Sequence, residues 1–362
     1  MIQEPPKKPG IARPLKRLRE IERKVPRTIV RIEKKIITFP FQKYFIGHAK
    51  PQPPPFKPDW RLWSDDRLTL AWLGHSTVLI NFFGTWILTD PVFSERCGIH
   101  VGPVTLGPRR LIEAPLQPED LPPLDLLLIS HAHMDHTDPP SLQRLLRAKQ
   151  VIVAANTLAV YKDHPFTNIR ELDWGESILI PDPDTRNPNL GTRVEALEVK
   201  HAGWRMPWDP CRSRNEKNGF SYNGYLVEKS VLNESNLPIQ DLGLRTQDLP
   251  RTTHAIVFGG DTGYTPKFQI LGDRMRAEER EIDCAIMPIG TYNPWVEAHA
   301  NPEQAWRMTQ EMNARVIVPV HWNTFVQSSE PRMEPIEWLR SLVDSDDQIA
   351  LSEHGETWTA EE

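Results

Sequence analysis

The stretch "LDLLLISHAHMDHTDPP", residues 124–140, constrains this chain more than any other part of the sequence. A mostly apolar run of seven residues, 124–130, is followed at once by His131, His133, Asp135 and His136. The apolar run is typical of a buried β-strand. Imidazole and carboxylate groups at the end of such a strand need partners, because burying an unpartnered polar group costs free energy. We therefore expect this strand to end at a site that satisfies all four side chains.

The spacing of these residues favours metal ions. Residues two apart at a strand end lie on the same side of the backbone, so His131 and His133 can reach one ion. Asp135 and His136 follow where the chain turns towards a helix, and they can reach a second ion about 3.5 to 4 Å from the first. Imidazole and carboxylate without thiolate favour Zn²⁺, although Mn²⁺ and Fe²⁺ accept the same ligands. We expect two ions in each chain.

Three later apolar runs also end in a candidate ligand. His201 ends "VEALEVKH", Asp261 follows "AIVFGG", and His321 follows "ARVIVPV". Loops at strand ends gather at one rim of a sheet, so these side chains are expected to join the first cluster. Four other histidines are interpreted as ordinary loop or core residues, namely His164, His254, His299 and His354.

The remaining pattern indicates an α/β chain that opens with a β-meander. "LTLAWL" and "STVLINFFGTWILTD" predict antiparallel strands with Gly84 in a tight turn. Later, "QVIVAA" follows the helical "PPSLQRLLRA", and "ARVIVPV" follows "NPEQAWRMTQEMN", where Asn301 is the predicted N-cap. The segments from Pro181 to Leu190 and from Asn233 to Arg251 are predicted to be surface loops.

The charge divides the chain into two parts. Residues 1–50 contain fourteen Lys and Arg against four Glu, a net +10, whereas the chain as a whole is −5. Apolar residues three and four apart predict an amphipathic helix in this arm, divided at Pro26, and "PQPPPFKP" predicts an extended link. We predict a basic arm and linker over 1–58 and one domain over 59–362. The arm binds an anionic membrane surface, or it packs on its own domain or on a homodimer mate.

Composition excludes several classes of protein. With 39% hydrophobic residues the chain can build a substantial core, and it has no apolar run of the roughly 18 to 20 residues that a spanning helix needs. No apolar secretory signal begins the chain, and three scattered cysteines suit a reducing compartment. We expect a cytoplasmic protein, peripheral on the membrane if the arm binds lipid. An acidic main domain disfavours nucleic acid as a partner.

Taken together, "HAHMDH", His201, Asp261 and His321 resemble the signature of the metallo-β-lactamase fold superfamily, over about residues 68 to 355. The resemblance implies a four-layer αβ/βα sandwich with the metals at one edge of the paired sheets. It implies that one zinc is held by His131, His133 and His201, and the other by Asp135, His136 and His321. Asp261 would bridge them. Asp90 in "LTDPVF" and His75 in "LGHST" would support the ligands from behind.

Within that superfamily the chain is similar to the N-acylphosphatidylethanolamine-hydrolysing phospholipase D group. The motifs that carry this likeness are "WLGHSTVLI", "TDPVFSERC", "LGPRRL", "LPPLDLLLISHAHMDH", "FGGDTGY" and "MPIGTYNPW". The segment after His201 and the segment "YNPWVEAHANPEQA" depart from the group pattern. The likeness implies a dinuclear zinc phosphodiesterase that cleaves N-acylphosphatidylethanolamine or a related glycerophospholipid by attack of a metal-bridged hydroxide.

The implied mechanism gives particular residues particular tasks. Asp135 would aim the hydroxide as well as bind metal, and Asp261 would hold the two ions together. Arg205 either contacts the substrate phosphate through its guanidinium or forms an ordinary surface ion pair. Trp204 and Tyr292 either line a substrate groove or pack in the core or at a dimer contact, and the same alternatives apply to Trp208 and Trp295.

Two other functions remain open from the sequence. One is a cytosolic lactonase that resembles the ascorbate-6-phosphate lactonase branch and uses a similar metal site on a small sugar acid. The other is a non-catalytic adaptor in which a closed metal site is purely structural and the arm recruits a partner.

Overall fold

The computed structural model describes residues 50–101, 104–164, 166–182, 190–206, 208–213, 217–232 and 251–360. The predictions for the basic arm lie outside the described residues. The same holds for most of the two predicted surface loops, because residues 183–189 and 233–250 are not described. These predictions stay predictions.

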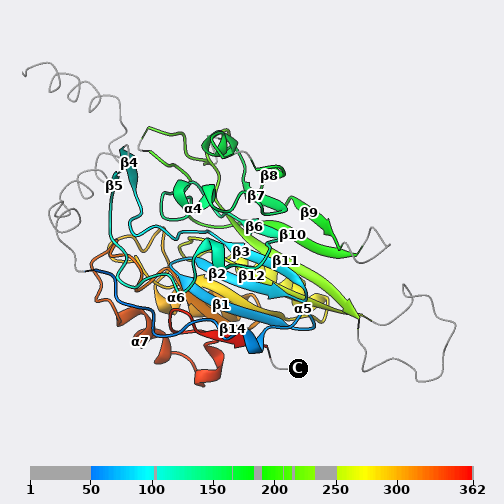
Figure 1. Ribbon diagram of the computed structural model, residues 1–362. Helices are drawn as coiled ribbons and strands as arrows, with labels where there is room; N and C mark the ends of the chain where they lie inside the picture. The colour runs from blue at the N-terminus through cyan, green and yellow to red at the C-terminus, as the bar shows by residue number, and fades with distance from the viewer. Residues whose placement is uncertain are drawn as a thin grey trace, which may run out of the picture. The chain divides into compact units, whose positions relative to one another are not determined.

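Two large sheets dominate the described part of the chain (Figure 1). The seven-stranded sheet has the order β15 (Thr357–Thr359), β1 (Leu68–Gly74), β2 (Thr77–Phe82), β3 (Thr85–Thr89), β6 (Leu126–Leu128), β7 (Gln150–Ala154) and β8 (Ile169–Leu172). The six-stranded sheet has the order β14 (Ala314–Val320), β13 (Ile282–Pro288), β12 (Arg251–Phe258), β11 (Asn223–Leu232), β10 (Gly191–Glu198) and β9 (Ser177–Pro181). A separate two-stranded hairpin pairs β4 (Ile99–Val101) with β5 (Val104–Leu106).

The helices are short and few in the described ranges. They are α4 (Pro139–Gln143), α5 (Lys267–Ala277), α6 (Pro302–Glu311) and α7 (Glu334–Arg340), with 3-10 turns at Trp60–Leu62, Pro118–Asp120, Leu158–Tyr161 and Asp346–Gln348. None of these helices is long and apolar enough to cross a membrane.

The predicted opening meander is confirmed. β1, β2 and β3 pair in sequence as antiparallel neighbours. Phe82 pairs with Thr85, which leaves a two-residue turn of Phe83 and Gly84 with φ angles of 50° and 83°. Two successive positive φ values are the requirement of the hairpin turn that matches strand twist, and Gly84 meets it without steric cost.

Alternating side chains of the seven-stranded sheet are buried on both of its faces. On β1, Leu70 and Trp72 belong to the core that the sheet shares with the six-stranded sheet. Their neighbours Ala71 and Leu73 belong to a second core, which includes Leu142 of α4. Helices α5 and α6 contribute buried residues to the core around the six-stranded sheet. The order is therefore helix, sheet, sheet, helix, and the predicted four-layer αβ/βα sandwich is confirmed.

Of the two predicted helices, one begins where expected and the other is shorter than expected. Asn301 caps α6 as predicted, because its Oδ1 accepts a hydrogen bond from Gln304 N at 2.8 Å. The helix predicted over "PPSLQRLLRA" is shorter than expected, since α4 ends at Gln143. Beyond it the chain continues in three-residue turns, including Ala148 N to Leu145 O at 3.1 Å. A turn of three residues keeps these two apolar side chains on one side, against the sheet.

The predicted boundary near Asp59 is too late. Gln52 N donates to Leu111 O at 2.8 Å, and Glu113 N donates to Gln52 O at 2.8 Å. Asp59 N donates to Thr357 Oγ1 at 2.9 Å. Prolines made this stretch look like a free linker, yet the main-chain groups of Gln52 and Phe56 form hydrogen bonds with residues of the main domain. Residues 50–58 thus belong to the main domain.

Helices α5 and α6 cross closely at Gly272, which gives a prediction about stability. A Cβ at Gly272 would lie 1.9 Å from Glu311 O, a main-chain atom that cannot rotate away. We expect Gly272→Ala to lower the free energy of unfolding by about 1 to 3 kcal/mol, the usual cost of overpacking. Urea denaturation measures this change.

Gln269→Ala is the control, because Gln269 is exposed on the same helix. It should leave the free energy of unfolding within about 0.5 kcal/mol of the native value. Equal stability of the two variants would contradict the close crossing.

Candidate metal centre

The predicted metal-binding residues come from loops at one edge of the two sheets. The loop after β6 carries residues 131–136, and the loops after β10, β12 and β14 carry His201, Asp261 and His321. Asn223 N, at the start of β11, donates to Ser130 O at 2.9 Å, and this hydrogen bond joins the two sheets beside the cluster. The structure brings all seven predicted ligands together.

The first group consists of His131, His133, His201 and Asp261, whose donor atoms all lie within 4.8 Å of one another. His133 Nδ1 lies 2.8 Å from His131 Nε2 and 3.1 Å from His201 Nε2. Asp261 Oδ2 lies 3.8 Å from His201 Nε2. These distances gather three imidazoles and a carboxylate around a volume that suits one ion.

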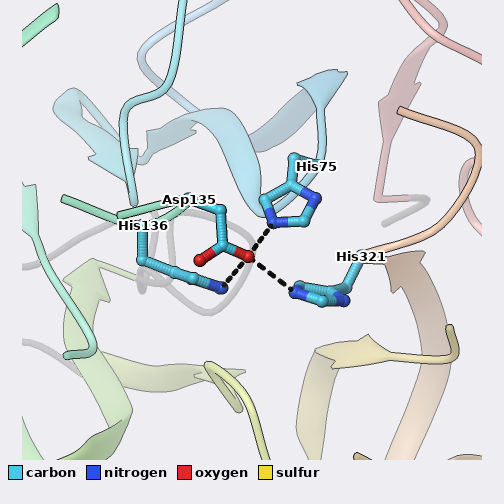
Figure 2. A group of neighbouring side chains, drawn as sticks. All are labelled: His75, Asp135, His136 and His321. Carbon is cyan, nitrogen blue, oxygen red and sulfur yellow. Dashed lines mark hydrogen bonds and ion pairs between the residues drawn. The ribbon is translucent and has the colours of Figure 1, made fainter. Parts of the chain in front are cut away.

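The second group consists of His75, Asp135, His136 and His321 (Figure 2). Asp135 Oδ2 lies 3.0 Å from His75 Nε2, 3.6 Å from His136 Nε2 and 3.5 Å from His321 Nε2. Figure 2 shows the three imidazoles directed at this one carboxylate oxygen. A second ion therefore has a set of nitrogen and oxygen donors of its own.

Asp261 lies between the two groups. Its Oδ2 is 3.9 Å from His131 Nε2 in the first group. The same atom is 3.1 Å from His136 Nε2 and 3.2 Å from His321 Nε2 in the second. A carboxylate in this position can bridge two cations.

The donor atoms lack the partners that a site without ions would need. Buried polar atoms with no hydrogen-bond partner among the described residues include His136 Nε2, His321 Nε2 and both carboxylate oxygens of Asp261. Leaving such atoms unsatisfied is costly, whereas nitrogen and oxygen atoms without thiolate are a donor set for Zn²⁺ or a similar divalent ion. The residues present fit a metal centre.

Burial and mutual charge set the protonation of the ligands. Burial, and next the neighbouring His201, lower the pKa of His133 to about 3, so this imidazole is neutral at pH 7. Burial raises the pKa of Asp261, but His136 and then His321 outweigh it and hold that pKa well below its usual value. Burial also raises the pKa of Asp135, but its imidazole neighbours, His136 most strongly, hold that pKa well below its usual value. These three groups are therefore ready to bind a cation.

Two imidazoles at the centre have pKa values that are raised instead of lowered. Burial lowers the pKa of His136, but Asp261, Asp135 and Asp90 together raise it well above its ordinary value. For His321 the carboxylates likewise prevail over burial and raise the pKa to about 9. Without ions, protons on these two rings balance the buried carboxylates. Cations that bind here must displace those protons.

Contacts behind the ligands fix which ring nitrogen faces the centre. Asp90 Oδ2 accepts a hydrogen bond from His136 Nδ1 at 2.6 Å, and Asp90 Oδ1 accepts one from Ser130 N at 2.7 Å. His201 Nδ1 donates to Ala298 O at 2.9 Å. Each contact engages Nδ1 and leaves Nε2 for a metal.

Three of the residues around the second group have a left-handed backbone. The φ angles are 54° for His75, 28° for Asp90 and 64° for His321. Non-glycine residues adopt such angles only where surrounding contacts impose them. His75 N donates to Thr324 Oγ1 at 2.6 Å, and His321 N donates to His75 O at 3.1 Å. The two loops therefore hold each other in place.

The sequence analysis missed two side chains at the centre. His299, interpreted as an ordinary residue, lies with Nδ1 3.7 Å from Asp261 Oδ2 and forms a further candidate ligand group with Asp261 and His321. That interpretation was wrong. His299 lies in the loop after β13, well beyond the end of that strand at Pro288, so the pattern of a polar residue at a strand end did not identify it. Gln327 Nε2 donates to Asp135 Oδ2 at 2.6 Å. Its residue type gives no metal-binding signal.

The structure places Arg205 and Tyr292 differently from the predicted substrate contacts. Arg205 Nη1 donates to Ala132 O at 3.0 Å and to Thr137 O at 2.9 Å, so the guanidinium braces the loop that carries the ligands. Tyr292 donates its hydroxyl hydrogen to Glu334 of α7, a structural contact.

Trp204, in contrast, lies at the centre itself. The Trp204 ring packs edge to face on His133, with ring centroids 4.8 Å apart. Of the three predicted substrate contacts, the geometry favours Trp204.

Comparisons with known proteins agree with this site. The model of the family described as "Beta-lactamase superfamily domain" matches residues 85–322. An uncharacterised protein of Mycobacterium tuberculosis is 31% identical over 281 residues, which cover 75% of this chain and 63% of that protein. N-acyl-phosphatidylethanolamine-hydrolyzing phospholipase D 1 of Caenorhabditis elegans is 27% identical over 315 residues, which cover 82% of this chain and 77% of that protein.

A solved structure shares the fold. Isothiocyanate hydrolase from Delia radicum gut bacteria superposes with a TM-score of 0.54 and 17% identity, over 81% of this chain and 99% of that one. At that identity the likeness shows the fold alone. The chain spans 63% of the length of the mycobacterial relative.

The pKa values predict how metal affinity depends on pH. His321 is protonated below its pKa of about 9 in the absence of ions, and a cation must displace that proton. Below pH 9 the apparent affinity should therefore rise by about tenfold per pH unit for each proton displaced. Competition with a chromophoric chelator from pH 6.5 to 8.5 measures this slope. A constant affinity over that range would contradict the proton balance.

The hydrogen bond between His136 Nδ1 and Asp90 Oδ2 gives a second prediction. Asp90→Asn keeps the shape of the side chain but removes the charged acceptor from His136 Nδ1. We expect zinc affinity to fall by about 10- to 100-fold, as is typical when such a contact is lost. Asp273→Asn, an exposed carboxylate on α5, is the control and should bind zinc like the native chain. Equal affinities of both variants, with unchanged circular dichroism, would count against this role of Asp90.

Proposed function

We propose a function for this chain, which belongs to the beta-lactamase superfamily. It is a hydrolase that holds two divalent metal ions and cleaves phosphodiester bonds. The observation that carries the proposal is the position of Asp261, whose Oδ2 lies within 4 Å of imidazole nitrogens from both ligand groups. Two ions held on either side of this carboxylate would be close enough to act on one water molecule. Zn²⁺ is the ion that the donor set favours.

We propose a phospholipase D type of reaction on N-acylphosphatidylethanolamine or a related glycerophospholipid. The relative from Caenorhabditis elegans, similar over 82% of this chain, supports this substrate class. So do the motifs around the centre, including "FGGDTGY", in which Asp261 lies. The products would be a phosphate monoester, phosphatidic acid, and an N-acylethanolamine.

Bound ions would supply a water molecule that is ionised near neutral pH and would neutralise charge on the phosphoryl oxygens. The protein holds Asp135 ionised and fixes it from two sides, through His75 and Gln327. A carboxylate held in this way can accept a hydrogen bond from the attacking water and set its direction. We assign Asp135 and Asp261 as the catalytic carboxylates.

His299 adds a neutral imidazole beside the centre. Burial is the strongest influence on its pKa and keeps it well below the ordinary value, so the ring carries one N–H at pH 7. A neutral imidazole can donate a hydrogen bond to a substrate oxygen without adding charge. We propose this contact for His299.

We propose further that the chain works at an anionic membrane surface, in the cytoplasm, with the basic arm of residues 1–50 assisting. The arm's net charge of +10 supports this partner.

The proposal predicts activity on two kinds of substrate. Zinc-loaded protein should hydrolyse the soluble diester bis(p-nitrophenyl) phosphate and release phosphatidic acid from N-acylphosphatidylethanolamine in mixed micelles. Asp135→Asn should lower kcat by about 100-fold or more, because it removes a charge that acts on the reacting atoms. Mass spectrometry of the lipid products measures this.

Asp273→Asn again serves as the control and should keep the native kcat. Hydrolysis of soluble lactones without diester cleavage would replace the proposal with the lactonase hypothesis. Zinc binding without turnover of any of these substrates would favour the adaptor hypothesis.

A further inference from the structure

His354 is a buried histidine to which the proposed reaction gives no task. It lies shortly before β15, and its side chain is fully buried. Its ring packs on that of Trp72 in β1, with the ring centroids 4.1 Å apart. The main chain is held on both sides, because His354 O accepts a hydrogen bond from Phe56 N at 3.2 Å and Gly355 N donates to Trp72 O at 2.8 Å. These main-chain and ring contacts fix the position of the imidazole.

The imidazole of His354 reaches the hydroxyl group of Thr324, since its Nε2 lies 2.9 Å from Thr324 Oγ1. The same hydroxyl accepts a hydrogen bond from His75 N at 2.6 Å and donates its hydrogen to Trp322 O at 3.2 Å. Burial, and next the charge of Arg110, hold the pKa of His354 well below its ordinary value, so the ring carries one N–H at pH 7. A hydroxyl has one hydrogen and two lone pairs, and the remaining lone pair accepts from His354 Nε2–H. The three contacts together give the hydroxyl one orientation.

Thr324 in turn holds the main chain of His75. This residue has a φ angle of 54°, a left-handed conformation that surrounding contacts must impose. Thr324 accepts from its N–H, and Trp72 Nε1 donates to its carbonyl oxygen at 2.9 Å. His354 contacts both of these side chains, one by a hydrogen bond and the other by ring packing. It therefore supports His75 from two sides.

The side chain of His75 extends this support to the second ligand group. His75 Nε2 lies 3.0 Å from Asp135 Oδ2, the carboxylate oxygen at the middle of that group (Figure 2). The first ligand group is supported from another segment, since His201 Nδ1 donates to Ala298 O at 2.9 Å. The contacts of His354 thus act on the second group.

We propose that His354 is a positioning residue for the second ligand group. Its Nε2–H orients the hydroxyl of Thr324, this hydroxyl holds the main chain of His75, and His75 holds the carboxylate of Asp135. His354 acts on the reaction through these neighbours alone. The proposal rests on the proposed function for the presence of a second ion, whereas the effect on the main chain of His75 does not require that ion.

Three variants of the full-length chain separate the hydrogen bond of His354 from the packing of its ring. His354→Gln has an amide nitrogen at about the distance of Nε2 from the main chain, so it restores the donor to Thr324. His354→Asn has the same amide one methylene group shorter, and it cannot reach Thr324. His354→Phe keeps a ring against Trp72 but has no donor.

His254→Phe is the matched control. The contacts of His254 resemble those of His354, because its ring packs on Phe83 with centroids 4.2 Å apart and its Nδ1 lies 3.2 Å from Asp283 Oδ2. Phe83 follows the end of β2, whereas His75 precedes the start of that strand. His254 therefore lies at the other end of β2 from the metal centre.

Competition with a chromophoric chelator measures the affinity for each zinc ion in turn. In H354N and H354F we expect the affinity for the second ion to fall by about 10- to 100-fold, as is typical when a contact behind a ligand is lost. The affinity for the first ion should stay within about twofold of the native value, because His354 supports a different group. H354Q and H254F should bind both ions like the native chain.

A double variant tests the route through Thr324. Thr324→Val removes the acceptor for both His354 and His75, and we expect the same selective loss of the second ion. Adding Thr324→Val to H354N should cause no further loss, because the two substitutions break one chain of hydrogen bonds. Losses that simply add would contradict this route.

Hydrogen exchange at saturating zinc measures the main chain of His75 directly. Exchange of its N–H should be faster by about tenfold or more in H354N and H354F than in the native chain, because local opening exposes this amide more often. H354Q should exchange like the native chain. Mass spectrometry of a peptide that contains residues 72–77 gives the rate.

Several outcomes would overturn the proposal. One is native affinity for the second ion in H354N and H354F. Another is an equal loss in H354Q, which would make ring packing the cause, and a third is an equal loss of both ions, which would indicate general destabilisation. Failure of the proposed function looks different, because the native chain would then bind one ion or leave diesters intact. Exchange of the His75 N–H decides in that case, since equal rates in native, H354N and H354F proteins would refute the positioning role.

Discussion

The structure depends on two carboxylates, Asp135 and Asp261, held ionised in a buried site. Burial by itself favours the neutral acid at both positions, and only the surrounding imidazoles reverse that preference. Removing one member of such a group leaves an uncompensated buried charge, which costs more than any surface contact. The loops at this edge of the sandwich are therefore constrained to bring imidazoles to the carboxylates. Divalent cations at the same place satisfy the same constraint more completely.

A buried guanidinium, that of Arg110, helps to hold the loops that carry these imidazoles. Arg110 donates to Val92 O at 2.6 Å, to Leu73 O at 3.0 Å and to Ile112 O at 3.1 Å. Leu73 lies two residues before His75, and Val92 lies two residues after Asp90, so one side chain joins the loops that support the second ligand group. Gly74 allows this approach, since a Cβ there would lie 2.5 Å from Arg110 Nη2. The motif "LGPRRL" in the sequence thus has a structural task.

The parts of this arrangement that the sequence predicts are those with a periodic or compositional signal. Apolar runs identify the strands, and a polar residue directly after each run places Asp261 and His321 at the common edge. Contacts set by loop conformation have no such signal. Gln327 reaches Asp135 only because of how the loop after His321 folds, and Arg205 binds main-chain carbonyls that no side-chain pattern reveals. Proline content misled the assignment of residues 50–58, since it does not show where the remaining N–H groups pair.

The metal ligands and the outward-facing side chains at this edge of the sandwich are carried by the same strand-end loops. Strand-end loops hold the ligands because only there can side chains from both sheets converge, and the same loops are free to present side chains outward. Trp204 packs on His133 while Trp208, four residues later, is exposed, so a single loop contacts the centre and also presents an apolar surface.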